Sequence, residues 1–151
     1  MRKIALLGST GSIGTQALDV AARHADRFQI IALTANTNAE KLFAQARQFH
    51  PRMCGLVREP ESIPDDLKHI DWVFGPECLK AAATLPEADD VLVSVVGVVG
   101  LAAVMEALAC GKRVLLANKE PLVAGGELVT EAARKAGHPL LPVDSEHSAI
   151  F

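Results

Sequence analysis

The chain lacks clustered cysteines and blocks of basic residues. Its three cysteines, Cys54, Cys78 and Cys110, lie far apart, which excludes a zinc knuckle and argues against a disulfide framework. A reducing cytoplasmic location is therefore expected. The 15 Lys and Arg residues are scattered among 18 Asp and Glu. Because nucleic-acid binding needs clustered positive charge, nucleic acid is not expected as a partner.

Long apolar runs are also missing. The run Ile4–Leu7 stops at Gly8, so it is shorter than the apolar core of a signal peptide. The longest uncharged stretch, Val91–Met105, has 15 residues, whereas a membrane span needs about 18 or more. A membrane is therefore not expected as a partner. Half of the 151 residues are apolar, which is enough for the packed core of one domain, or of one domain plus the start of another.

Short apolar segments typical of buried strands alternate with helical patterns. Strands are expected at residues 3–8, 28–35, 53–57, 72–74, 90–97, 113–118 and 139–144, and helices at 12–24, 39–49, 76–84, 101–110 and 124–136. In the first helix, Ile13, Ala17, Val20 and Ala21 are expected to share the buried face. This alternation predicts an α/β fold, a Rossmann-like doubly wound, mostly parallel sheet with helices on both faces. Ligands of such sheets bind beyond the carboxyl ends of the strands.

The turn after the first strand has the sequence Gly8-Ser-Thr-Gly11-Ser-Ile-Gly14. Glycines let the backbone approach a pyrophosphate closely, and the following helix offers free N–H groups. A glycine turn that only packs a helix on a strand has a similar pattern. The position between the first strand and the first helix favours dinucleotide binding.

The second strand ends in Thr34-Ala-Asn36-Thr37-Asn38, with no carboxylate before Glu40. An NAD site usually has Asp or Glu at this point, so its absence favours NADP. No Arg or Lys stands at the strand end to pair with the 2′-phosphate, although Thr37 and Asn38 could donate neutral hydrogen bonds. Asn38 could equally cap the next helix.

Two later strand ends carry polar groups. Asn118-Lys119-Glu120-Pro121 could contact a cofactor and a substrate, or could be a solvated turn before a helix. Asp144-Ser145-Glu146-His147 places two carboxylates two residues apart, a pattern that suits Mg²⁺ or Mn²⁺. The alternative for the second segment is a helix cap.

The segments GSTGSIG, LLANKE and LPVDSEHSAIF, in this order and spacing, resemble the 1-deoxy-D-xylulose 5-phosphate reductoisomerase family. The resemblance implies that residues 1–151 form an NADPH-binding domain that ends where the metal- and substrate-binding catalytic region starts. It implies an oxidoreductase of non-mevalonate isoprenoid biosynthesis. Such an enzyme rearranges 1-deoxy-D-xylulose 5-phosphate with the help of Mg²⁺, Mn²⁺ or Co²⁺ and reduces the product with NADPH, giving 2-C-methyl-D-erythritol 4-phosphate. It also implies a homodimer for the full-length enzyme, and cofactor binding without turnover for this chain alone.

The resemblance also assigns roles by motif. Cofactor contacts fall on Gly8, Thr10, Gly11, Ser12, Ile13, Asn36, Thr37, Asn38, Asn118 and Glu120. Catalytic roles fall on Lys119 and Glu146, substrate contacts on Lys119, Ser145 and Glu146, and metal ligation on Asp144 and Glu146, whereas His147 is not a ligand. Members of the family often have a basic residue where Thr37 stands.

Two other functions fit part of the pattern. A different NADP-dependent dehydrogenase, such as a homoserine-dehydrogenase-like enzyme, also has an Ala-Asn-Lys strand end but does not explain the segment Asp144–His147. A non-catalytic dinucleotide-sensing module would keep the glycine turn and would have no need for Lys119, Asp144 and Glu146.

Overall fold

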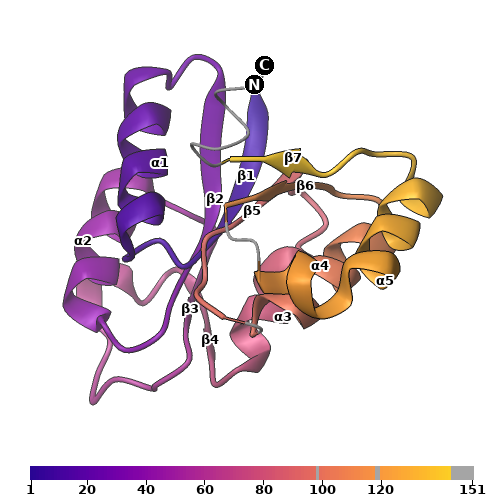
Figure 1. Ribbon diagram of the computed structural model, residues 1–151. Coiled ribbons are helices and arrows are strands. Elements are labelled where there is room, and N and C mark those ends of the chain that lie inside the picture. The colour runs from indigo at the N-terminus through magenta and orange to yellow at the C-terminus, as the bar shows by residue number, and fades with distance from the viewer. Residues whose placement is uncertain (98, 118–119, 144–151) are drawn as a thin grey trace.

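The computed structural model describes residues 1–97, 99–117 and 120–143. Its centre is a seven-stranded sheet with the order β4-β3-β2-β1-β5-β6-β7, in which every neighbouring pair is parallel (Figure 1). The strands are β1 (Arg2–Leu7), β2 (Phe28–Ala35), β3 (Met53–Leu56), β4 (Asp71–Phe74), β5 (Asp90–Val93), β6 (Arg113–Leu116) and β7 (Leu141–Pro142). The helices are α1 (Ser12–Arg23), α2 (Ala39–Phe49), α3 (Glu77–Ala83), α4 (Gly100–Ala109) and α5 (Glu120–Ala136), with a short 3₁₀ turn at Asp65–Leu67. The predicted doubly wound fold is confirmed.

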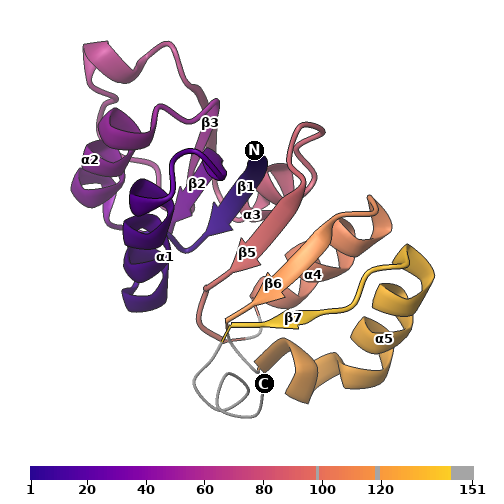
Figure 2. The same cartoon turned by 90° about the horizontal axis from the view of Figure 1, so that it is seen from above.

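Helices cover both faces of the sheet. Helices α1 and α2 lie on one face, and α3, α4 and α5 lie on the other (Figure 2). Successive strand residues point to opposite faces, so Leu6 packs with the α1 and α2 layer while Leu7 packs with the other layer. Both side chains are fully buried, which explains why the strands are almost continuously apolar in sequence.

Helix α1 buries most of the predicted face, since Ala21 is buried and Ile13 and Ala17 are partly buried against the core. Gly14, Leu18 and Ala21 are buried, whereas Val20 is 51% exposed, so the prediction for Val20 was wrong. The buried face is centred on Gly14, Leu18 and Ala21, with Ile13 and Ala17 at its margin. The pattern therefore predicted the helix and its buried side, except at Val20.

Two element boundaries also differ from the prediction. Strand β5 ends at Val93 and not at Gly97, because the Ser94 N–H donates to Leu7 O (2.9 Å) and the chain then leaves the sheet. Helix α5 begins at Glu120 and not at residue 124. It is interrupted by non-helical backbone at Gly125 (φ −142°, ψ 31°), where the missing side chain makes room for Leu101.

Charged groups join three strands at the amino edge of the sheet, opposite the strand ends where ligands are expected. Asp90, whose side chain is 2% exposed, accepts two hydrogen bonds from Arg2 and two from Arg113, all between 2.6 and 2.8 Å. Burial, the largest single effect, acts to raise the pKa of Asp90, but the bonds and charges of the two arginines outweigh it and lower the pKa. This cluster stabilises the fold and lies away from the candidate site.

No helix in the described part of the chain is long and apolar enough to cross a membrane.

Candidate dinucleotide site

The glycine loop after β1 is held by hydrogen bonds from both neighbouring strands. On the β2 side, the N–H groups of Gly8 (3.1 Å) and Ser9 (2.8 Å) donate to Thr34 O. On the β5 side, the Ser94 hydroxyl lies 2.7 Å from Leu7 O and 3.1 Å from Gly8 O. Gly8 has φ +85°, and a Cβ there would lie 3.0 Å from the Ser94 backbone, so the turn requires glycine. The loop thus lies between β2 and β5, where the strand order reverses and Rossmann-like folds bind dinucleotides.

A buried polar pair, Ser9 and Gln45, fixes the glycine loop to helix α2. The Ser9 hydroxyl donates to Gln45 Oε1 (2.6 Å), and Gln45 Nε2 donates back to Ser9 O (2.9 Å). Both residues are buried, and Gln45 lies on the apolar face of α2 beside Leu42 and Ala46. Sequence reasoning missed this pair, although a glutamine among apolar positions of a helix was a visible signal.

The start of helix α1 is open for an anion. Gly11 is the N-cap, no side chain caps the helix, and its first turn has no acidic residue. A helix leaves its first backbone N–H groups without partners inside the helix, and these groups attract negative charge. A Cβ at Gly11 would meet only Gly8 O, at 3.5 Å, whereas a Cβ at Gly14 would lie 2.3 Å from that same oxygen. Gly14 therefore lets the helix start close to the strand, and Gly11 leaves the space above the loop open.

A lysine from α2 adds positive charge to the loop. Lys41 Nζ donates to Thr10 O at 2.8 Å. The sequence indicated Lys41 only as a nearby cation, and the structure places its ammonium group on the glycine loop. A phosphate group bound at this loop would therefore meet both the N–H groups of α1 and a fixed ammonium.

The loop after β2 lies next to the glycine loop. Asn36, Thr37 and Asn38 are all exposed. Asn38 caps α2, because its side-chain oxygen accepts from the Lys41 N–H at 3.1 Å, so the capping interpretation is confirmed.

The later strand ends are described only in part. Glu120 begins α5 after β6 and is half-buried. The other polar residues predicted at these ends lie outside the described residues: Asn118, Lys119, Asp144, Ser145, Glu146 and His147. Within residues 1–97, 99–117 and 120–143, no group of three or more His, Cys, Asp and Glu side chains could hold a metal ion.

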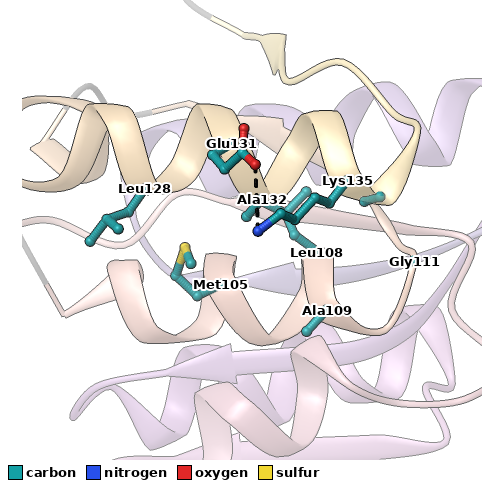
Figure 3. A pocket seen from close by; sticks show the side chains of 9 residues that line it. Met105, Leu108, Ala109, Gly111, Leu128, Glu131, Ala132 and Lys135 are labelled. Carbon is teal, nitrogen blue, oxygen red and sulfur yellow. Dashed lines mark ion pairs between the residues drawn. The ribbon is translucent and has the colours of Figure 1, made fainter.

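A groove of about 570 Å³ lies between α4 and α5 and is a poor candidate for the site (Figure 3). Met105, Leu108 and Leu128 line it together with the ion pair of Glu131 and Lys135, whose charged atoms are 3.4 Å apart. It reaches the carboxyl ends of both helices. These ends lie at the amino edge of the sheet, because crossover helices run antiparallel to the strands they connect. The groove is therefore remote from the glycine loop.

Comparison with known proteins gives a clear result. The family model of 1-deoxy-D-xylulose 5-phosphate reductoisomerase matches residues 4–126. The chain belongs to this family. A relative of that name from Ralstonia nicotianae is 48% identical over all of this chain, and one from Methylococcus capsulatus is 44% identical. The match covers 40% of each relative, so the chain spans about 40% of their length. The resemblance inferred from the three motifs is thereby confirmed, and the homoserine-dehydrogenase-like alternative is disfavoured.

Solved structures of family members agree with the fold. The reductoisomerase from Zymomonas mobilis, solved in complex with NADPH, matches with a TM-score of 0.88 and 41% identity, covering 99% of this chain and 40% of that one. A reductoisomerase solved with NADPH, fosmidomycin and magnesium matches with a TM-score of 0.88 and 36% identity, covering 99% of this chain and 38% of that one.

Proposed function

We propose that the chain is the NADPH-binding domain of a 1-deoxy-D-xylulose 5-phosphate reductoisomerase. The observation that carries this proposal is the start of α1 at Gly11, which no side chain caps and which follows a loop held by hydrogen bonds from β2 and β5. The related structures solved with NADPH support the same choice of cofactor.

The described residues suit a dinucleotide phosphate. The backbone of Thr10, Gly11, Ser12 and Ile13 would hold the pyrophosphate at the N-terminus of α1, with the Lys41 ammonium beside it. Gly8 would allow the close approach of the backbone. The loop of Asn36, Thr37 and Asn38 would bind the phosphorylated ribose, since no carboxylate stands there to repel it. The nicotinamide supplies the hydride when the cofactor is bound, and the protein positions it.

The remaining roles rest on the family motif, and except for Glu120 they belong to residues outside the described part. Asn118 and Glu120 would contact the cofactor, and Lys119 and Ser145 would hold oxygens of the substrate. Asp144 and Glu146 would ligate the divalent cation, which is Mg²⁺, Mn²⁺ or Co²⁺, and Glu146, like Lys119, would also act in catalysis. Bound there, such an ion would act as a Lewis acid toward substrate oxygens. We place the boundary with the catalytic region at this segment.

For the whole protein we propose the activity of the family, the rearrangement and reduction of 1-deoxy-D-xylulose 5-phosphate to 2-C-methyl-D-erythritol 4-phosphate. We further propose that it is a homodimer of the cytoplasm. The 151-residue chain alone should bind cofactor without turnover, since two protein carboxylates offer only a part of the roughly six positions that Mg²⁺ fills.

Thermal unfolding of the chain with and without cofactor tests the proposal. NADPH at about 100 times its dissociation constant should add roughly 2.7 kcal/mol to the free energy of unfolding. For a domain of this size the midpoint should rise by about 5–10 °C. The control is Gly11→Val, which should show a much smaller rise at the same NADPH concentration. An unchanged midpoint of the unsubstituted chain at millimolar NADPH would contradict the proposal.

Activity provides the second arm of the test. With substrate and metal, NADPH consumption by this chain should stay at the blank rate, whereas the full-length protein should turn over. A full-length protein that binds NADPH and converts no substrate would favour the dinucleotide-sensing alternative.

A further inference from the structure

A second cation stands at the adenosine end of the proposed site. Arg58 follows β3 and is exposed. Its backbone N–H donates to Asn36 O at 2.9 Å, and the Val57 N–H donates to Ala35 O at 3.1 Å. The chain after β3 therefore remains beside the chain after β2, past the last residues of both strands.

The bond between Arg58 and Asn36 places Arg58 close to Thr37. In the β2–β3 pair, Thr34 lies opposite Gly55 and Ala35 lies opposite Leu56. Both chains bend beyond these pairs, but the bond from the Arg58 N–H to Asn36 O keeps the Arg58 backbone beside Asn36, the residue before Thr37. Neighbouring strands are about 4.8 Å apart, a distance that an arginine side chain easily spans. The guanidinium of Arg58 can therefore reach a group bound against Thr37.

Of the two cations near the loop after β2, Lys41 and Arg58, Arg58 is the one whose charged group is not already bonded to a residue that the structure describes. Lys41 Nζ is already bonded to Thr10 O on the glycine loop. In the described part of the chain, the Arg58 guanidinium has no hydrogen bond and no ion pair.

We propose that Arg58 binds the 2′-phosphate of NADPH and is the residue with which this chain separates NADPH from NADH. The inference rests on the proposed cofactor function and adds a residue that the motif does not assign. A guanidinium can donate two parallel hydrogen bonds to one phosphate, and such charge-assisted bonds are about twice as strong as neutral ones. Arg58 would then supply from β3 the positive charge that Thr37 does not supply from β2.

Fluorescence titration of the chain with NADPH and with NADH tests this inference. Arg58→Gln should weaken NADPH binding about tenfold or more and leave NADH binding within about twofold, because NADH lacks the 2′-phosphate. The matched control is Arg23→Gln, which removes the same charge from the exposed far end of α1 and should change neither affinity. Adding Thr37→Arg to Arg58→Gln should restore the preference for NADPH, since it returns a cation to the loop after β2.

The outcomes separate this inference from the proposed function. NADPH and NADH affinities that both stay unchanged in Arg58→Gln, or that both fall equally, would overturn the role of Arg58 while leaving cofactor binding intact. Failure of the unsubstituted chain to bind either cofactor would instead overturn the proposed function, and this inference with it. Thermal melts of Arg58→Gln without cofactor should match the unsubstituted chain, because Arg58 is exposed and its side chain forms no hydrogen bond or ion pair with the residues that the structure describes.

Discussion

The glycine loop allows a paired test that separates binding from packing. Gly11 and Gly14 are three residues apart in the same loop and helix, but their surroundings differ. Gly11 has extended backbone (φ −72°, ψ 175°), which any residue adopts, and a Cβ there would make one ordinary contact of 3.5 Å. At Gly14 a Cβ would lie 2.3 Å from Gly8 O and 2.7 Å from Ser9 Cα, both backbone atoms that cannot rotate away.

Gly11→Val should therefore leave the fold nearly intact and weaken cofactor binding. Valine is a poor N-cap compared with glycine, which costs up to about 1 kcal/mol of stability. This loss corresponds to a fall in the melting midpoint of about 2–4 °C. The valine side chain would occupy the space through which the pyrophosphate approaches the N–H groups of α1. NADPH affinity should fall at least tenfold, which is about 1.4 kcal/mol.

Gly14→Ala should have the opposite effect, a larger loss of stability and a smaller direct effect on cofactor binding. Alanine gains about 1 kcal/mol in helix propensity, but forcing a methyl group into a closely packed position costs about 1–3 kcal/mol. Because both contacts are with backbone, we expect the upper end of that cost and a net loss of about 2 kcal/mol. The melting midpoint should fall by about 4–8 °C.

Urea unfolding curves and NADPH titrations of both variants provide the measurement. For each variant, the loss of NADPH affinity is compared with the loss of unfolding free energy. Gly11→Val should lose more affinity for each kcal/mol of lost stability than Gly14→Ala. If Gly11→Val binds NADPH normally, the space at Gly11 is not the path of the pyrophosphate. If Gly14→Ala is as stable as the unsubstituted chain, the close contact at Gly14 does not limit the packing of α1.

Three further predictions concern stability and reactivity. Asp90→Asn should cost about 3 kcal/mol at pH 7, because it disrupts a buried ion cluster. Since the folded state lowers the pKa of Asp90, this stabilisation is present above about pH 4 and is lost as the pH falls through the folded pKa, so urea curves of variant and parent should converge only below the ordinary pKa of an aspartate. Burial raises the pKa of Cys54 to about 12 and, as the largest effect, that of Cys78 to about 11. Iodoacetamide at pH 8 should therefore label exposed Cys110 alone in the folded chain and all three cysteines in urea, as mass spectrometry would show. Asn38→Ala should cost about 1 kcal/mol through loss of the helix cap, and an unchanged melting midpoint would refute the capping role.

Local patterns in the sequence predicted the elements because a parallel sheet buried on both faces needs continuous apolar strands. The same rule failed at the end of β5, where apolar residues continue beyond the strand. Val96 is 84% exposed and Val99 is 61% exposed, so their apolar character has no explanation in the packing of this domain. Hydrophobicity alone therefore could not indicate that the strand ends at Val93. Val20 in α1 was misassigned for a related reason, since it is apolar and yet lies on the exposed side of the helix.

The candidate site was predictable where it depends on local sequence. The glycine spacing and the missing carboxylate after β2 can be found from the residues alone. The contacts that hold the loop could not be found in this way, because Gln45 and Ser94 reach it from segments far away in the chain. Arg58 was missed for the same reason, since its position beside Asn36 follows from the pairing of β2 with β3. Pairing between strands is a property of the assembled sheet.

The place of β1 in the sheet has a consequence during synthesis of the protein. One side of β1 pairs with β2, which leaves the ribosome soon afterwards, but the other side pairs with β5, where Ile4 lies opposite Asp90. At about 5–20 residues per second, translation needs roughly 4–17 s to add the residues between them. For that time the growing chain presents an apolar strand with one unpaired edge, the kind of surface that adds strands from other molecules. Chains released before Asp90 should therefore aggregate, and nascent chains of this length should be substrates for chaperones that bind apolar segments at the ribosome.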